Sequence, residues 1–342
     1  MGLSSARIRV SELRTSPRRP RPVAVLLAGV AAATGLCGCN PLGSQATPAD
    51  SPVVTVGVVP GIDNATLFLA KKRGYFAEAG IDVRIRDFAT VNAELRALSD
   101  GHVDVAAGDY GNLFARQSAL QKEAYKILAD GYDAAPGVVE IMTMPDSPVK
   151  TATDLTVIGA PDVDEVSAPR GGPNSLVIAS ATSVLQSYGV NLSNLMWKNM
   201  SETDEISQLV SGRLKAVLLT QPYVYKAQQQ GAIELVDACS GSTAGIPLSG
   251  YFTSTSWSQN NSKGVAAFRA GLAEADAQAS MPGPVQSVLP TYAKLTREEA
   301  ALVTTGVYPL STITANLQRT ADLMNVVGMI KRQLNVAKMI AK

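Results

Sequence analysis

The spacing of apolar and polar side chains from residue 53 onward predicts strands that alternate with helices. Residues 53–59 form an apolar, β-branched run, and the turn-forming residues 60–64 separate this run from a helix-like segment at 65–73. Further strand patterns follow at residues 81–88 and 103–107. Because strands separated by helices pair in parallel through right-handed crossovers, the pattern predicts an α/β fold.

The same order of elements returns later in the chain. A strand pattern at residues 155–160, a loop at 161–174 and a helix pattern at 175–188 repeat the first unit. Residues 98–105, with the sequence LSDGHVDV, align with residues 209–216, with the sequence LVSGRLKA. The repeat predicts two similar lobes, each built on a parallel-dominated sheet with flanking helices.

A ligand-binding cleft is expected where two such lobes face each other. In open parallel sheets, small molecules bind outside the carboxyl ends of the strands, where helix N-termini present free N–H groups. Polar and aromatic residues in the loops after the strands are therefore candidate ligand contacts, although each could instead only cap a helix or shape a turn. The candidates are Asp63, Asn64, Thr66, Thr90, Asp109, Tyr110, Ser175, Asn199, Gln221, Tyr223 and Tyr251.

Other reactive side chains are few. Arg170 lies in an inserted loop, and its guanidinium group would suit a sulfonate or carboxylate, with a solvated arginine as the alternative. His102 is expected at the surface or at a strand edge, and Cys239 is expected to be a small buried apolar residue rather than a nucleophile. With one histidine and no cluster of metal-ligand residues, the sequence predicts no metal, no cofactor and no catalytic residue.

The N-terminal residues have the charge and order of an export signal. A leader with six arginines precedes the uncharged stretch Val23 to Leu36, which is shorter than the roughly 20 apolar residues that span a membrane. The stretch ends in Leu36-Cys37-Gly38-Cys39, which resembles the bacterial lipobox. This resemblance implies a signal peptide at 1–38 and a lipid on Cys39 that anchors the protein to the outer face of the cytoplasmic membrane.

Ordinary secretion and an uncleaved anchor are the alternatives to lipid anchoring. The pair Arg18-Arg19 hints at twin-arginine export, but the neighbouring prolines fit that motif poorly, so general secretion is favoured. Residues 39–52 are rich in Pro, Ser, Gly and Ala and are expected to form a flexible tether.

The charge of the processed chain excludes some partners. Removing residues 1–38 takes away six arginines and one glutamate, so the 30 basic and 29 acidic residues become 24 and 28, a net charge of −4. This balance argues against a nucleic-acid or anionic-membrane partner. The remaining residues suffice for two ordinary domains, and a monomer is expected.

A family resemblance enters at residues 67–76, with the sequence LFLAKKRGYF, which continue to Gly80-Ile81-Asp82-Val83. These residues resemble the nitrate, sulfonate and taurine substrate-binding proteins of ABC importers, which share their fold with binders of thiamine-pyrimidine precursors. The family's "sGxvDva" stretch is matched by residues 99–106, with Asp100 inserted before the glycine. Lys215 departs from the family, which usually repeats its Asp there, and residues 163–172 have the character of an insertion.

The resemblance implies a type II periplasmic-binding-protein fold with a ligand cleft between two lobes. Lobe I would contain residues 53–139 and 253–342, and lobe II residues 140–252, with crossings near Val139 to Met144 and near Gly250 to Thr253. The resemblance further implies a non-enzymatic protein that captures a sulfonate, nitrate, taurine-like anion or related small solute and delivers it to a membrane permease. An enzyme of pyrimidine or menaquinone precursor metabolism on the same fold, and the ligand-binding subunit of a membrane sensor, are the alternatives.

Overall fold

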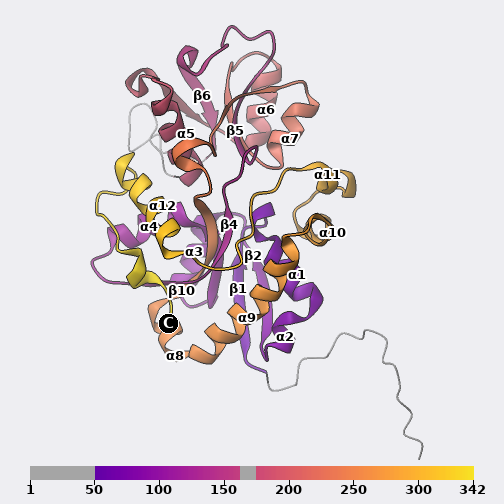
Figure 1. Ribbon diagram of the computed structural model, residues 1–342, viewed down its shortest axis with the longest axis vertical. Helices are drawn as coiled ribbons and strands as arrows, with labels where there is room; N and C mark the ends of the chain where they lie inside the picture. Colours follow the sequence, from indigo (N-terminus) through magenta and orange to yellow (C-terminus); the bar gives the residue numbers. More distant parts are fainter. Residues whose placement is uncertain (1–50, 162–174) are drawn as a thin grey trace, which may run out of the picture. The chain divides into compact units, whose positions relative to one another are not determined.

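The computed structural model describes residues 51–161 and 175–342, which contain two five-stranded sheets (Figure 1). The signal peptide, Cys39, most of the tether, Arg170 and the insertion at 163–172 therefore lie outside the described residues. The first sheet contains β1 (Val53–Val58), β2 (Asp82–Asp87), β3 (Val105–Asp109), β4 (Tyr125–Asp133) and β10 (Pro247–Ser254). The second contains β5 (Val139–Thr143), β6 (Val157–Ala160), β7 (Met196–Asn199), β8 (Val217–Thr220) and β9 (Ile233–Asp237).

Both sheets have the same pattern of strand directions. In the first sheet the order is β2-β1-β3-β10-β4, with β1 parallel to β2 and β3, and with β10 antiparallel to both of its neighbours. In the second sheet the order is β7-β6-β8-β5-β9, with β5 as the one reversed strand. The predicted α/β fold with two parallel-dominated sheets is therefore confirmed, and the repeat in the sequence corresponds to a repeat in topology.

Helices connect the strands and cover the sheets (Figure 1). The helices that precede or follow the strands of the second sheet along the chain are α1 (Ala65–Arg73), α2 (Tyr75–Glu78), α3 (Val91–Ser99), α4 (Tyr110–Ala119), α8 (Thr255–Asn260), α9 (Ser262–Ala279), α10 (Pro282–Tyr292), α11 (Arg297–Leu302) and α12 (Thr314–Val326). Those between the strands of the second sheet are α5 (Leu176–Ser187), α6 (Glu202–Val210) and α7 (Tyr223–Gln229). Short 3₁₀ helices are η1 (Ile62–Asn64), η2 (Ala152–Asp154), η3 (Leu192–Asn194), η4 (Gly241–Thr243) and η5 (Val336–Met339).

The chain passes between the two sheets twice. The first connection, residues 134–138, joins β4 to β5, and the second, residues 238–246, joins β9 to β10. The crossings expected near 139–144 and near 250–253 thus fall inside β5 and β10. An extended connection and a strand have the same apolar alternation, so the sequence pattern does not separate them.

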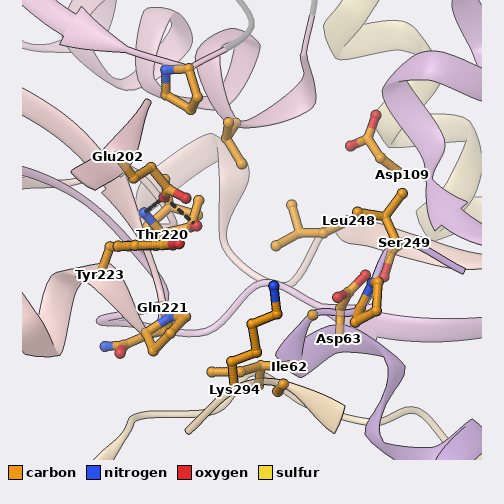
Figure 2. Close-up of a pocket in the computed structure, with 18 of the residues that line it drawn as sticks. Ile62, Asp63, Asp109, Glu202, Thr220, Gln221, Tyr223, Leu248, Ser249 and Lys294 are labelled. Carbon is orange, nitrogen blue, oxygen red and sulfur yellow. Dashed lines mark hydrogen bonds between the residues drawn. The ribbon is translucent and has the colours of Figure 1, made fainter. Parts of the chain in front are cut away.

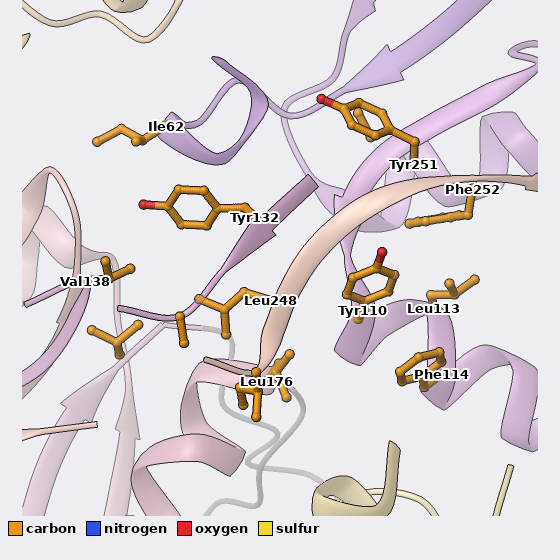
Figure 3. Close-up of a cluster of buried hydrophobic side chains, with 14 of the residues drawn as sticks. Ile62, Tyr110, Leu113, Phe114, Tyr132, Val138, Leu176, Leu248, Tyr251 and Phe252 are labelled. Atoms are coloured by element: carbon orange, nitrogen blue, oxygen red, sulfur yellow. The ribbon is translucent and has the colours of Figure 1, made fainter. Parts of the chain in front are cut away.

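Buried side chains pack the helices of both sheets together near the strand ends. Tyr110 of α4 is fully buried, and its ring stacks on that of Phe114 with the ring centroids 5.6 Å apart (Figure 3). Leu176, the first residue of α5, belongs to the same buried cluster. The two helix starts approach closely, because a Cβ atom on Gly111 would lie 2.8 Å from the backbone nitrogen of Leu176. Buried apolar side chains at the starts of α4 and α5 therefore pack together close to the strand ends.

The expectations for Cys239 and His102 agree with the structure. Cys239 is a buried free thiol, and His102 is exposed. Within residues 51–161 and 175–342, no group of three or more His, Cys, Asp and Glu side chains is arranged to hold a metal ion. No helix in this part of the chain has both the length and the apolar character to cross a membrane.

Candidate functional site

A cavity of about 910 Å³ lies at the carboxyl ends of the parallel strands of both sheets (Figure 2). The loops after β1, β2 and β3, together with β10, form one wall, and the segments around the start of α6 and after β8 form the other. A third segment, which follows α10, completes the lining. The cavity therefore occupies the position at which open α/β sheets bind small molecules.

Asp63 is an acidic residue of the wall formed by the first sheet. It lies in η1, directly after β1, and accepts a hydrogen bond of 3.3 Å from Nδ2 of Asn64. Burial raises the pKa of the Asp63 carboxyl to about 6, and a hydrogen bond from Ser249 opposes this rise. A hydrogen-bond donor on a ligand would stabilise the ionised form of this carboxyl further.

Asp109 caps a helix and also lines the cavity. Its Oδ1 atom accepts hydrogen bonds from the backbone nitrogen and from Nδ2 of Asn112, at 2.8 and 3.1 Å, so Asp109 is the N-cap of α4. The same residue lines the cavity. Asp109 thus combines the two roles that the sequence left open for the strand-end residues, a cap and a place on the wall.

Glu202 holds the opposite wall together. Its Oε1 atom accepts hydrogen bonds from the backbone nitrogen of Thr220, at 2.9 Å, and from its hydroxyl, at 2.6 Å, which ties the start of α6 to the end of β8. Gln221 follows, and its Nε2 atom donates to the carbonyl oxygen of Gly137 over 2.9 Å. Gln221 thereby links this wall to the first connection between the sheets, while its buried Oε1 atom has no partner within the described residues.

Two lysines bring positive charge to the cavity. Nζ of Lys226 lies 4.0 Å from a carboxylate oxygen of Glu299 and 5.2 Å from the centre of the Tyr223 ring. Lys294 follows α10 and extends into the cavity between the wall with Tyr223 and the wall with Asp63 (Figure 2). The cavity is therefore lined by both signs of charge.

The cavity brings together four of the sequence-predicted contacts. These are Asp63, Asp109, Gln221 and Tyr223, which come from both sheets. Sequence reasoning did not select Glu202, Thr220, Lys226, Leu248, Ser249 or Lys294, which also line the cavity. Glu202 and Thr220 lie within three residues of the predicted contacts Asn199 and Gln221 and could have been found by extending the selection along the chain, whereas no local signal marks Lys294.

The other candidates lie away from the cavity wall. Thr66 and Tyr251 are fully buried and their hydroxyls lie 3.2 Å apart. The Tyr110 hydroxyl donates to Asp130 over 3.1 Å, and burial raises the pKa of Tyr110. Nδ2 of Asn64 also donates to the carbonyl oxygen of Ala107 in β3. For these four residues, the structure shows a role in packing.

Three further candidates mark the starts or ends of elements. The Thr90 hydroxyl accepts a hydrogen bond of 3.2 Å from the backbone nitrogen of Ala93 and caps α3. Ser175 is the buried N-cap residue of α5, and its hydroxyl has no partner in the described part of the chain. Asn199 is exposed at the end of β7. The ligand-binding role of every candidate stays a prediction.

Comparisons with known proteins agree with this architecture. Residues 47–154 match the model of the NMT1-like family. Among curated proteins, none matches the sequence significantly. The periplasmic aliphatic sulphonate binding protein SsuA from Escherichia coli has a similar structure, with a TM-score of 0.67 and 17% identity over 85% of this chain and 97% of that chain.

Two other solved structures show the range of proteins with this fold. The alkanesulfonate-binding protein SsuA from Xanthomonas axonopodis pv. citri, bound to MOPS, has a TM-score of 0.62 and 17% identity over 86% of this chain and 99% of that chain. The desulfurization enzyme DSZB has a TM-score of 0.65 and 14% identity over 84% and 96%. The chain therefore has the α/β fold of periplasmic binding proteins, with an NMT1-like segment at residues 47–154, which confirms the predicted resemblance in fold.

Proposed function

We propose that this protein is the extracytoplasmic solute-binding component of an ABC importer. The observation that carries the proposal is the cavity of about 910 Å³ at the strand ends of both sheets, which has polar side chains from each sheet on its walls. A cavity of this size suits a small molecule. The two sheets are the cores of two lobes, and the ligand stabilises the closed arrangement that a permease recognises.

The ligand is a small anionic solute of the sulfonate, nitrate or taurine-like class, or a related compound. The likeness in fold to two sulfonate-binding proteins supports this class, as do the two lysines on the cavity wall. Native mass spectrometry of the purified protein, followed by titration calorimetry with the compound that is found, tests the proposal. A protein that retains no solute, and that no solute in a broad panel stabilises against heat, would contradict it.

Export and a lipid anchor on Cys39 complete the proposed function. A lipid would hold the binding protein close to its permease and so raise the local concentration of the captured solute. Replacement of Cys39 by serine should release the protein from the membrane fraction into the soluble exported fraction, without changing its affinity for the solute. Membrane attachment that persists in this variant would indicate an uncleaved signal rather than a lipid.

An enzyme is the second candidate, because the desulfurization enzyme DSZB shares the fold. Against this candidate, the cavity-lining residues within the described part of the chain include neither cysteine nor histidine. Cys239 is no substitute, since burial raises the pKa of its thiol to about 12, and a thiol rather than a thiolate is a poor nucleophile. Incubation with the identified solute and mass spectrometry of the recovered compound separates the two candidates, because a binding protein returns the solute unchanged.

A further inference from the structure

Lys294 has an unusual backbone conformation for its residue type. Its φ angle is 54°, and among the described residues it is the only non-glycine residue with a positive φ. Ten glycines occupy the other positions of this kind, among them Gly74 directly after α1. In the left-handed region a side chain crowds the backbone, which is why glycine is preferred there. Lys294 thus stands after α10, at a place where glycine would be less strained.

The side chain of Lys294 offers a reason for this residue. Lys294 lines the cavity, and its ammonium group extends into the space between the two walls (Figure 2). No ion pair within 4.0 Å among the described residues includes Lys294. Lys226, the other lysine on the wall, is engaged with Glu299 and with the ring of Tyr223. Backbone strain of this kind gathers at functional sites, where the side chain has a use that outweighs the strain.

The charged side chains on the cavity wall show why the ammonium group of Lys294 matters for the binding of an acidic solute. Asp63, Asp109, Glu202 and Lys226 line the same cavity as Lys294, so both signs of charge are present among the described lining residues. Without Lys294, the cations on the described part of the cavity wall would be reduced to Lys226, which is already engaged with Glu299 and with the ring of Tyr223. An ammonium group that faces the cavity and is not paired with these carboxylates provides a direct contact for an acid group.

We propose that Lys294 is the residue that selects the charge of the ligand, with its ammonium group binding the acid group of a small anionic solute. This inference rests on the proposed solute-binding function, which it deepens by assigning a specificity-determining residue. The left-handed backbone aims the side chain into the cavity, and the exposed position of Lys294 leaves it accessible to an arriving solute.

Matched probes test the inference. Butane-1-sulfonate, butan-1-ol and butylammonium share a carbon chain and differ in charge, and titration calorimetry measures their affinities for the purified protein. We expect the wild-type protein to prefer the sulfonate, and Lys294→Met to weaken sulfonate binding at least about tenfold, as the loss of a charge-assisted hydrogen bond does. Binding of butan-1-ol should not change. Lys294→Arg should retain the preference, and Lys263→Met, an exposed lysine on α9, is the matched control.

Lys294→Gly separates a role in binding from a role in folding. Glycine relieves the left-handed strain, so the melting temperature should stay the same or rise while sulfonate affinity falls as in Lys294→Met. Sulfonate affinity that is unchanged in both variants would overturn the assignment of Lys294 and leave the solute-binding function standing. A wild-type protein that binds solutes but prefers butan-1-ol or butylammonium would also overturn the assignment of Lys294 and leave the solute-binding function standing. A protein that binds no solute of any charge would overturn both the assignment of Lys294 and the solute-binding function.

Discussion

Glu94 and Glu205 occupy the same position in the two copies of the repeated unit. Each is the fourth residue of a helix, α3 or α6, whose N-cap hydroxyl comes from Thr90 or Ser201. Both side chains are fully buried. Oε1 of Glu94 accepts a hydrogen bond of 3.0 Å from the backbone nitrogen of Ala107, whereas neither carboxyl oxygen of Glu205 has a partner within the described residues.

The first prediction concerns the pH dependence of stability through Glu205. Burial, and to a lesser degree the charge of Glu202, raises the pKa of Glu205 from 4.5 to about 9. Between these values the folded protein binds a proton that the unfolded chain has lost, so the free energy of unfolding should fall as the pH rises and level off above pH 9. Glu205→Gln removes this titration, and urea unfolding at several pH values should therefore show a weaker decline.

Glu94→Gln provides the comparison for Glu205→Gln. Burial raises the pKa of Glu94 to about 8, and the hydrogen bond from Ala107 opposes this rise. Its effect on the pH dependence should have the same sign and a smaller size, because one oxygen is already paired in the folded protein. If the free energy of unfolding falls equally with rising pH in the wild-type protein and in Glu205→Gln, the Glu205 carboxyl does not titrate as a buried group.

The second prediction separates packing from binding among the tyrosines. Tyr251→Phe removes a buried hydroxyl that lies 3.2 Å from that of Thr66, so the free energy of unfolding should fall by about 1 kcal/mol while solute affinity stays unchanged. Tyr223→Phe should have the opposite profile, since Tyr223 lines the cavity. Chemical denaturation and calorimetry measure the two quantities, and a loss of affinity in Tyr251→Phe would place Tyr251 in the binding site after all.

The third prediction uses one substitution at two glycines. A Cβ atom on Gly250 would lie 2.0 Å from the Tyr110 hydroxyl oxygen and 2.8 Å from the carbonyl oxygen of Ala129, so Gly250→Ala should destabilise the protein by about 2 kcal/mol or more. Gly264 lies in α9, and a Cβ atom there would make only ordinary contacts of 3.5 Å or more with Trp257 and Asn261, so Gly264→Ala should stabilise the protein by about 0.5–1 kcal/mol. Equal effects in thermal unfolding would refute the close packing of β10 against α4.

The fourth prediction concerns the pH dependence of binding. The pKa of Asp63, raised to about 6 mainly by burial, means that acidification from pH 7.5 to pH 5 removes a negative charge from the cavity wall. An anionic solute should therefore bind more tightly at the lower pH. Asp63→Asn should bind the anion more tightly at pH 7.5 and lose most of the dependence, and calorimetry at the two pH values measures both effects. A wild-type affinity that falls on acidification would contradict this role of Asp63.

Local patterns in the sequence sufficed for much of the fold. The apolar run at residues 53–59 and the helix-like segment at 65–73 correspond to β1 and α1, because the spacing of apolar side chains reflects burial within a single element. The alignment of residues 98–105 with 209–216 likewise revealed the duplicated topology. The rule for parallel sheets predicted a cleft at the strand ends, and the structure has a cavity there that is lined by Asp63, Asp109, Gln221 and Tyr223.

Tertiary structure decided which residues face the cavity and which lie in the core. Tyr251 belongs to β10, which inserts between β3 and β4, and this pairing of residues far apart in the sequence turns its side chain into the interior. Lys294 reaches the cavity only because α10 ends beside the cavity in space. The sequence alone thus determined the order of elements along the chain. It also predicts the export signal. The lining of the cavity depends on long-range packing and strand register, which no local pattern encodes.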